Sequence, residues 1–177
     1  RYPTPQELRN MIYSGLAGGV KGIITYDFSF DLVNNQVSLW NEFKRLRTDV
    51  ATLENVFLDG KLSRVFTGDQ ELVVSYWEYN NEYYVVVVNT SYTVTKGVSI
   101  TLLFPNEESA TALFSRMPNT LSFSKGTFSG NIAAREVEVY KISQNPNAVE
   151  SNYGNESLIK VYPNPTYGPL FFTDPEN

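Results

Sequence analysis

The sequence contains no cysteine and no histidine among its 177 residues. Without cysteine, neither a disulfide framework nor a thiolate metal site can form. Without histidine, the commonest metal ligand and the commonest general base are both missing. We therefore expect no metal and no cofactor, and cysteine usage gives no information about the redox state of the compartment.

Positive charge and long apolar runs are also scarce. Lys and Arg number 14 against 19 Asp and Glu, which gives a net charge of −5 and a pI near 4.8. No basic cluster is present to neutralise phosphates, so we expect no nucleic-acid partner. No run approaches the ~18 apolar residues of a membrane helix, so we expect no membrane span. A hydrophobic content of 42% is enough for a folded core.

The chain opens with the signals of a helix. Thr4 suits the N-cap, Pro5 the first helical position and Glu7 the third position of a capping box. Gly18-Gly19 supplies a left-handed stop. The apolar residues that recur at helical spacing are Leu8, Met11, Ile12 and Leu16.

A short apolar run and a second helix follow. Residues 20–26 contain Val20, Ile23 and Ile24 without a polar alternation, which predicts a strand covered on both faces in a parallel sheet. Asn34-Asn35 offers a cap for the second helix. Its apolar pattern consists of Leu39, Phe43, Leu46, Val50 and Leu53.

These residues carry a resemblance to a known group of enzymes. The matching phrases are Arg1-Tyr-Pro-Thr-Pro-Gln-Glu-Leu-Arg and Tyr13-Ser-Gly-Leu-Ala-Gly-Gly-Val-Lys-Gly-Ile-Ile-Thr-Tyr. Together with the helix after them, they resemble the last helix–strand–helix of TIM-barrel glycoside hydrolases of the β-galactosidase-like group. The resemblance implies that residues 1–60 are the C-terminal βα portion of a barrel, and that barrel and any export signal extend upstream of Arg1.

The pattern changes after Gly60 to β-branched and aromatic runs separated by turn residues. Asn80-Asn81 predicts a two-residue hairpin turn. The strands expected are 72–79, 83–89, 98–104, 111–114, 121–124 and 136–142. The sequence therefore predicts an antiparallel β-sandwich over residues 61–143. Gly126-Thr-Phe-Ser-Gly with Arg135-Glu-Val-Glu-Val-Tyr-Lys-Ile resembles the end of the small β-domain that follows many hydrolase barrels, a domain that usually packs on the barrel without doing chemistry.

The C-terminal residues are polar and then rich in proline. Residues 144–157 read as a linker. Val161-Tyr-Pro-Asn-Pro-Thr with Gly168 resembles the opening of the sorting domain of the type IX secretion system of Bacteroidetes. The resemblance implies a secreted or cell-surface protein that engages the secretion machinery through residues 158–177. The match stops before the later strands of such a domain, so it would not be expected to direct export by itself.

Glycoside hydrolysis requires two carboxyl groups that face one sugar. By resemblance the pair belongs to the fourth and seventh barrel strands, upstream of Arg1, so no catalytic residue is assigned and the chain alone is expected to be inactive. Tyr26 and Asp27 close the predicted strand at the end where TIM-barrel sites lie, which makes them candidates for substrate binding. Alternatively, Tyr26 packs under the next loop and Asp27 accepts hydrogen bonds from backbone N–H groups there.

Aromatic residues leave a choice between packing and sugar stacking. Trp40 lies on the second helix, where packing is the usual role. A group on the predicted hairpin suits either the core or a carbohydrate platform, and consists of Trp77, Tyr79, Tyr83 and Tyr84. Two functions follow. One is the C-terminal part of a secreted glycoside hydrolase acting on polysaccharide or oligosaccharide, and the alternative is a non-catalytic surface protein whose β-domain binds glycan or protein.

Overall fold

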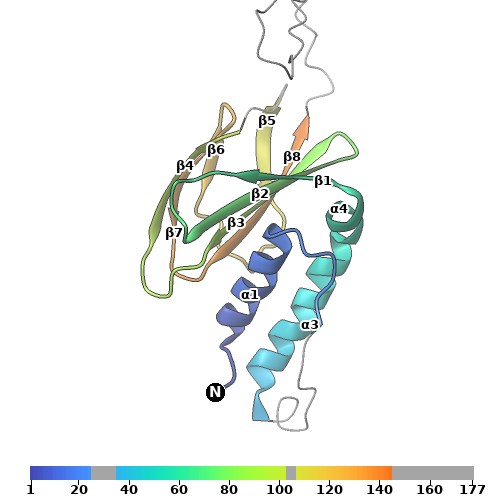
Figure 1. The fold of residues 1–177 in the computed structure, drawn as a ribbon, viewed down its shortest axis with the longest axis vertical. Helices are drawn as coiled ribbons and strands as arrows, with labels where there is room; N and C mark the ends of the chain where they lie inside the picture. The colour runs from blue at the N-terminus through green and yellow to red at the C-terminus, as the bar shows by residue number, and fades with distance from the viewer. Residues whose placement is uncertain (25–34, 103–106, 145–177) are drawn as a thin grey trace, which may run out of the picture. The chain divides into compact units, whose positions relative to one another are not determined.

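Helices precede strands along the chain, as Figure 1 shows. The structure is a computed structural model that describes residues 1–24, 35–102 and 107–144. The helices are α1 (Pro5–Ala17), α3 (Val37–Thr52) and α4 (Glu54–Asp59). The strands are β1 (Lys61–Val65), β2 (Leu72–Tyr79), β3 (Glu82–Asn89), β4 (Lys96–Thr101), β5 (Glu107–Ala112), β6 (Ser122–Ser124), β7 (Thr127–Ile132) and β8 (Val137–Gln144).

Helix α1 begins with the predicted capping box. The Thr4 hydroxyl accepts the Glu7 N–H at 3.2 Å, and the Glu7 carboxylate accepts the Thr4 N–H at 2.7 Å. The chain leaves the helix through Gly19, whose φ is +85°. The residues that α1 buries are Glu7, Ile12, Tyr13, Leu16 and Ala17. The prediction for Met11 is wrong: it lies one position off this face and is 64% exposed.

Helix α3 has the predicted helical spacing of buried residues, but its N-cap and part of its buried face differ from the prediction. Its N-cap is Gln36, whose side chain makes no capping bond, so the predicted cap at Asn35 is wrong and Asn34 lies outside the described residues. The buried positions of α3 and its C-cap are Leu39, Glu42, Leu46, Asp49 and Leu53. The predicted Phe43 and Val50 are half-buried at the edge of this face. Two acidic residues therefore share the inner face of the helix.

The predicted parallel strand is not present in its described part. Residues 20–24 carry no strand assignment, and residues 25–26 lie outside the described residues. Val20 and Ile23 are about two-fifths exposed, and Ile24 is 98% exposed. A buried parallel strand needs a hydrogen-bonded neighbour, and no described strand pairs with this segment. This prediction is therefore wrong for residues 20–24.

The prediction of antiparallel β-structure after residue 60 is confirmed. One sheet has the order β1-β2-β3-β8-β5 and the other has the order β4-β7-β6. The β2–β3 hairpin turns at Asn80-Asn81, whose φ angles are +51° and +60°, and Tyr79 pairs with Glu82 as a two-residue turn requires. The expected strands at 98–104 and 111–114 begin earlier, at Lys96 and Glu107. Strands β1 and β7 were not among the predicted strands.

Two apolar layers lie on the two faces of the larger sheet. One fills the space between the sheets and includes Val85, Val87, Ile100, Phe128 and Ile142. The other lies between the larger sheet and the helices and includes Ile12, Leu46, Phe57, Trp77, Val86 and Val139. Figure 1 shows the helices on the side of the larger sheet away from β4, β6 and β7. The helices and the sheet thus share a core, while the division into domains at residues 60, 143 and 157 stays a prediction.

Candidate functional site

The two residues predicted to bind substrate, Tyr26 and Asp27, lie outside the described residues. Their role therefore stays a prediction.

The aromatic residues of the β2–β3 hairpin form core rather than a platform. Trp77 is 1% exposed and meets Phe57 edge to face, with ring centroids 5.0 Å apart. Tyr83 is 7% exposed, and Tyr79 and Tyr84 are half-buried against the same core as Trp77. The hypothesis of a carbohydrate platform is therefore wrong. Successive residues of a strand point to opposite faces of the sheet, and because both faces of this sheet are covered, the side chains on each face pack in a core.

Trp40 also packs. It is half-buried on α3 and stacks on Phe43, with ring centroids 5.6 Å apart and an interplanar angle of 12°. The Lys44 ammonium lies 5.9 Å from the Trp40 ring centroid. These contacts support the packing role expected for an aromatic residue on the helix.

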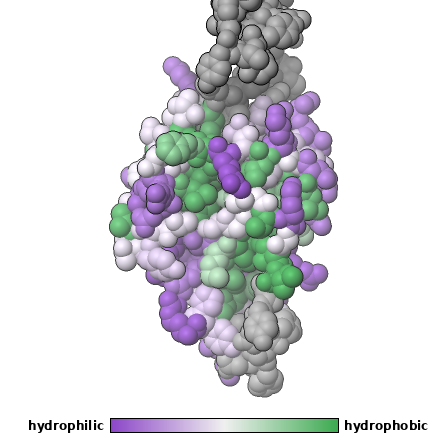
Figure 2. Space-filling view, in the orientation of Figure 1, coloured by the Kyte–Doolittle hydropathy of each residue, from purple (hydrophilic) through white to green (hydrophobic). Residues whose placement is uncertain are grey.

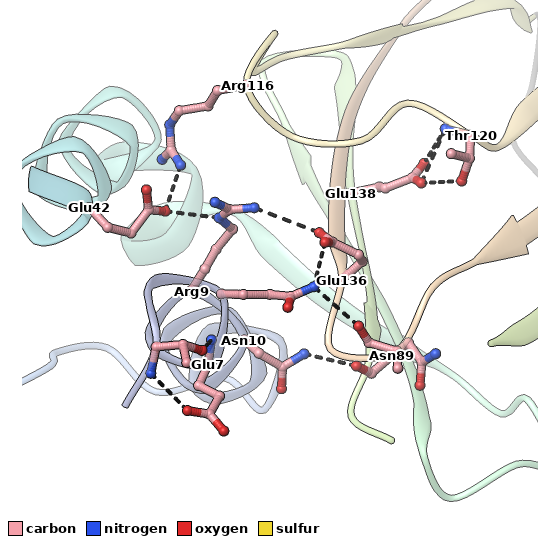
Figure 3. A network of polar contacts seen from close by, with 12 residues as sticks. Glu7, Arg9, Asn10, Glu42, Asn89, Arg116, Thr120, Glu136 and Glu138 are labelled. Carbon is pink, nitrogen blue, oxygen red and sulfur yellow. Dashed lines mark hydrogen bonds and ion pairs between the residues drawn. The ribbon is translucent and has the colours of Figure 1, made fainter. Parts of the chain in front are cut away.

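A network of ion pairs joins the helices to the larger sheet (Figure 3). Arg9 of α1 donates through Nε to Glu42 Oε1 at 2.9 Å, and its Nη1 lies 3.6 Å from Glu136 Oε2. Arg116, in the turn between β5 and β6, donates to Glu42 Oε1 at 2.7 Å and also to Asp49 Oδ2. We call these five residues the junction network. In Figure 3, Arg9 extends between Glu42 of α3 and Glu136, which precedes β8.

The carboxylates Glu42 and Asp49 of the junction network are buried, and burial shifts pKa values in the network and beside it. Burial raises the pKa of the Asp49 carboxyl, and the Arg116 guanidinium opposes that rise. Burial also raises the pKa of the Tyr13 hydroxyl, which has no hydrogen-bond partner among the described residues. Glu42 is 2% exposed and Asp49 is 7% exposed. A catalytic pair of carboxylates must face a sugar, and these two are buried and bound to arginines of the same chain. They act instead as a clamp, by which we mean ion pairs that hold the helices against the sheet.

Another buried carboxylate, that of Glu138, holds the turn before β6. Glu138 of β8 is fully buried and accepts the Thr120 hydroxyl at 2.5 Å and the Leu121 N–H at 3.2 Å. The Tyr140 hydroxyl donates to the same carboxylate. Figure 3 shows Glu138 directed toward Thr120, away from the junction network. This carboxylate is fully engaged with its own chain and has no free edge for a substrate.

Glu7 binds two arginines at the start of α1. Its carboxylate accepts hydrogen bonds from both Nη atoms of Arg1, each at 2.8 Å, and from Nη1 of Arg135 at 2.6 Å. The hydrogen bond from Arg1, followed by that from the Thr4 N–H, lowers the pKa of the Glu7 carboxyl well below its usual range. Glu7 is therefore ionised across the physiological range and fixes both guanidinium groups.

Two hollows lie on either side of α1. One of about 330 Å³ is mostly apolar and lies against α3 and α4; its lining includes Ile12, Ile23, Phe43, Val50 and Leu58, with Lys21, Arg47 and Glu54 also present. The other, of about 690 Å³, has a mixed lining that includes Glu7, Asn10, Met11, Ser14, Tyr92 and Arg135. We call these the apolar hollow and the Tyr92 groove. Both volumes fall in or near the range of about 300–1,000 Å³ that ligand pockets occupy.

Within residues 1–24, 35–102 and 107–144, no three Asp or Glu side chains gather as a possible metal site. None of the helices in these ranges is long and apolar enough to cross a membrane.

Sequence reasoning missed the residues of the junction network and the Tyr92 groove. For the network a signal existed: Glu42 and Asp49 are seven residues apart and in phase with Leu39 and Leu46, which places acids on an apolar helix face. For the groove no local signal existed, because Tyr92 and Arg135 are 43 positions apart and meet only through the fold.

The fold class that these elements define is a two-sheet antiparallel β-structure with helices on one face. No family model and no curated protein matches the sequence. Solved structures that resemble it include an α-amylase from Geobacillus thermoleovorans, with TM-score 0.47, 17% identity, and 67% of this chain covered against 25% of the amylase.

Two further structures are also glycoside hydrolases. A trehalose-6-phosphate hydrolase from Bacillus licheniformis gives a TM-score of 0.45 at 16% identity, over 66% of this chain and 20% of the hydrolase. The family 30 subfamily 8 xylanase from Clostridium acetobutylicum gives 0.36 at 18% identity, over 46% of this chain and 24% of the xylanase. The matches thus span a quarter or less of each of these enzymes. With TM-scores below 0.5, they do not assign an activity to this chain.

Proposed function

We propose that this chain is the C-terminal part of a secreted glycoside hydrolase that acts on polysaccharide or oligosaccharide. In this proposal α1, residues 20–26 and α3 are the last helix–strand–helix of a TIM barrel, and the β-structure after residue 60 is the domain appended to it. Residues 20–24 are not a strand in the structure, and the proposal requires that they become one by pairing with upstream barrel strands. The proposal rests on the sequence resemblance of residues 1–60 and on one structural observation, an exposed apolar surface on the helical side.

That surface surrounds the segment predicted as a barrel strand. The large apolar side chains exposed in this segment and beside it are Val20, Ile23, Ile24 and Leu58. Ile23 and Leu58 also line the apolar hollow. Figure 2 shows apolar residues, mixed with polar ones, at the lower right of the molecule, where Figure 1 draws the helices. Large apolar side chains exposed close together are often covered by another part of a protein, and in this proposal the remaining barrel strands supply that cover.

Catalysis is assigned to the part upstream of Arg1. The buried carboxylates of the described residues are Glu7, Glu42, Asp49 and Glu138. Each of them is bound to arginines or to backbone and hydroxyl donors of this chain. In the proposed enzyme Tyr26 and Asp27 lie at the barrel mouth and contact the sugar, while the clamp between helices and sheet holds the appended domain in place.

The proposed destination is the cell surface or the medium. It rests on Val161-Tyr-Pro-Asn-Pro-Thr with Gly168, and it makes the type IX secretion machinery of a Bacteroidetes species the partner of residues 158–177. These residues lie outside the described part of the chain.

The coding sequence upstream of Arg1 tests the proposal. We expect alternating strand and helix patterns, with two Asp or Glu residues at the C-terminal ends of two strands. A Gln substitution at either residue should abolish hydrolysis by the full-length enzyme without changing its thermal unfolding. An upstream sequence with no such pattern would favour the alternative, a non-catalytic surface protein whose β-domain binds glycan or protein.

A further inference from the structure

We propose that Lys21, Arg64 and Ser75 are positioning residues that fix where the chain leaves α1, and with it the start of the predicted barrel strand. The inference rests on the proposed function, in which residues 20–26 are that strand, and deepens it by giving the β-structure a part in substrate binding. It stands on the hydrogen bonds that these three side chains donate to backbone carbonyl groups, which we call the exit contacts, and on the close packing of β1 against Gly19.

The end of α1 is held by two strands of the larger sheet. The Ser75 hydroxyl of β2 donates to the Ala17 carbonyl at 2.9 Å, and both residues are buried. Arg64 of β1 donates through Nη2 to the Gly18 carbonyl. The last carbonyl groups of a helix have no partners within it, and a cation beside them also faces the negative end of the helix dipole. The two strands therefore supply partners that α1 itself cannot.

The turn after α1 packs closely against β1. Gly19 has φ +85°, and a Cβ atom at this position would lie 2.9 Å from Leu62 Cδ2. The Gly19 N–H donates to the Leu16 carbonyl at 2.7 Å. The Val20 N–H donates to the Gly15 carbonyl at 3.2 Å. The turn is thus fixed by α1 on one side and by a β1 side chain on the other, so the direction in which the chain departs has little freedom.

Lys21 holds the next part of the chain against α4. Its ammonium donates to the Phe57 carbonyl at 2.6 Å and to the Leu58 carbonyl at 2.7 Å. Both carbonyl groups belong to the last turn of α4, so the contact places a positive charge at the C-terminal end of that helix. Figure 1 draws the chain after α1 beside α4, which leads into β1. The exit contacts therefore hold the chain at Ala17, at Gly18 and at Lys21 itself.

The exit contacts affect substrate binding through the strand that follows them in the proposed enzyme. Once such a strand is paired, the position of its first residue sets the position of its last. In the proposal the residues at its far end are Tyr26 and Asp27, which lie outside the described residues. Binding residues act at full strength only when supporting contacts hold them in the productive geometry. Loss of an exit contact should therefore weaken substrate binding more than it slows the chemical step, whose carboxylate pair is assigned upstream.

Steady-state kinetics of the full-length protein on xylan, β-glucan and starch test the inference. Lys21→Met keeps the alkyl stem of the side chain and removes its charged donor, and Arg64→Met does the same on β1. We expect each variant to raise KM at least about threefold while kcat stays within about twofold, because the interaction lost is one that substrate and transition state share. Lys21→Arg keeps a charged donor and should hold KM within about twofold of the wild-type value.

Lys61→Met is the matched control. Lys61 also lies on β1, but its side chain is 80% exposed and its partner is Glu78 at 4.0 Å, so its loss should leave KM unchanged. Lys21 and Arg64 are exposed as well, so both variants should fold, and thermal unfolding checks this.

The inference is overturned if Lys21→Met and Arg64→Met leave KM unchanged, if kcat falls as far as KM rises, or if Lys61→Met raises KM as much as they do. A full-length protein that hydrolyses none of the three polysaccharides overturns the proposed function and this inference with it. An active protein whose KM does not respond overturns this inference alone, so the two failures are distinguishable.

Discussion

At the scale of single residues, the main finding is that acids occupy the buried face of α3. Apolar spacing predicted Leu39, Leu46 and Leu53 correctly, and the capping box of Thr4 and Glu7 followed from local sequence alone. The partners of Glu42 and Asp49 could not be predicted. Arg116 lies 74 and 67 positions from them, and no local pattern encodes contacts at such separations.

The junction network should contribute strongly to stability. In Arg116→Ala, Glu42 and Asp49 remain buried without the guanidinium that they share, and breaking a buried ion pair costs about 3–5 kcal/mol. We expect the free energy of unfolding in urea to fall by about this amount. Arg45→Ala is the matched control, because Arg45 lies 4.0 Å from the same Glu42 carboxylate but its side chain is 62% exposed; it should cost less than about 1 kcal/mol. Equal losses in both variants would show that the network is not a clamp.

Glu7 should make stability depend on pH with a definite sign. Because the hydrogen bonds from Arg1 and from the Thr4 N–H lower the folded-state pKa of Glu7, its contribution to stability is complete above the unfolded pKa of about 4.3 and is lost as the pH falls through the folded pKa. Glu7→Gln keeps the shape of the capping residue and removes the charge. The difference in Tm between wild type and this variant should be largest near pH 7 and should shrink steadily below about pH 4. A difference that is constant from pH 7 to pH 3 would contradict the assignment.

At the scale of elements, local chemistry decided which predictions succeeded. The β2–β3 hairpin was predicted to within one residue, since Asn80-Asn81 adopts the positive φ angles that a two-residue turn needs. Strand β7 escaped prediction because its sequence, Thr-Phe-Ser-Gly-Asn-Ile, contains only two large apolar residues. The prediction for residues 20–24 failed in the opposite direction, because a strand was expected and none formed. The apolar run there matches a buried strand, but a strand also requires hydrogen-bonded neighbours, which local sequence cannot specify.

Gly130 should be the most sensitive glycine of the β-structure. Its φ is +144°, and a Cβ atom there would lie 2.8 Å from the Thr120 carbonyl oxygen. Gly68 has φ +76° with open space around it, and Gly22 has open space and no positive φ. Alanine should therefore cost little at Gly22, about 1–2 kcal/mol at Gly68 and more at Gly130. Thermal unfolding of the three variants measures this order, and a Gly130→Ala variant as stable as Gly22→Ala would refute the close approach of β7 to Thr120.

At the scale of the whole molecule, helices and β-structure depend on one another. One face of the larger sheet is covered by α1, α3 and α4 together with the segment that contains Leu113, Phe114 and Met117, and the side chains on that face include Trp77, Val86 and Val139. A boundary at residue 60 therefore separates secondary-structure types but not cores. This could not be predicted from sequence, because a strand that alternates between two apolar faces does not show what covers each face.

Removal of the helices should expose that face. In a chain of residues 61–145, the only tryptophan is Trp77, which the intact chain buries to 1% exposure. We expect its fluorescence to shift to the red, hydrophobic dyes to bind and cooperative unfolding to weaken, because the apolar surface has lost its cover. Residues 1–145 provide the control and should unfold cooperatively. If residues 61–145 unfold with the same midpoint as the control, the shared core is not essential.

The central claim is that this chain is the supporting C-terminal part of a glycoside hydrolase whose carboxylate pair lies upstream. The measurement that tests it most directly compares the full-length protein with the 177-residue chain for release of reducing sugar from xylan, β-glucan and starch. The account predicts hydrolysis of at least one polysaccharide by the full-length protein and none by the 177-residue chain, because binding without the carboxylate pair cannot stabilise the transition state. Activity in the 177-residue chain that is lost on mutating one of its own acidic residues, or no activity in either protein, would contradict it.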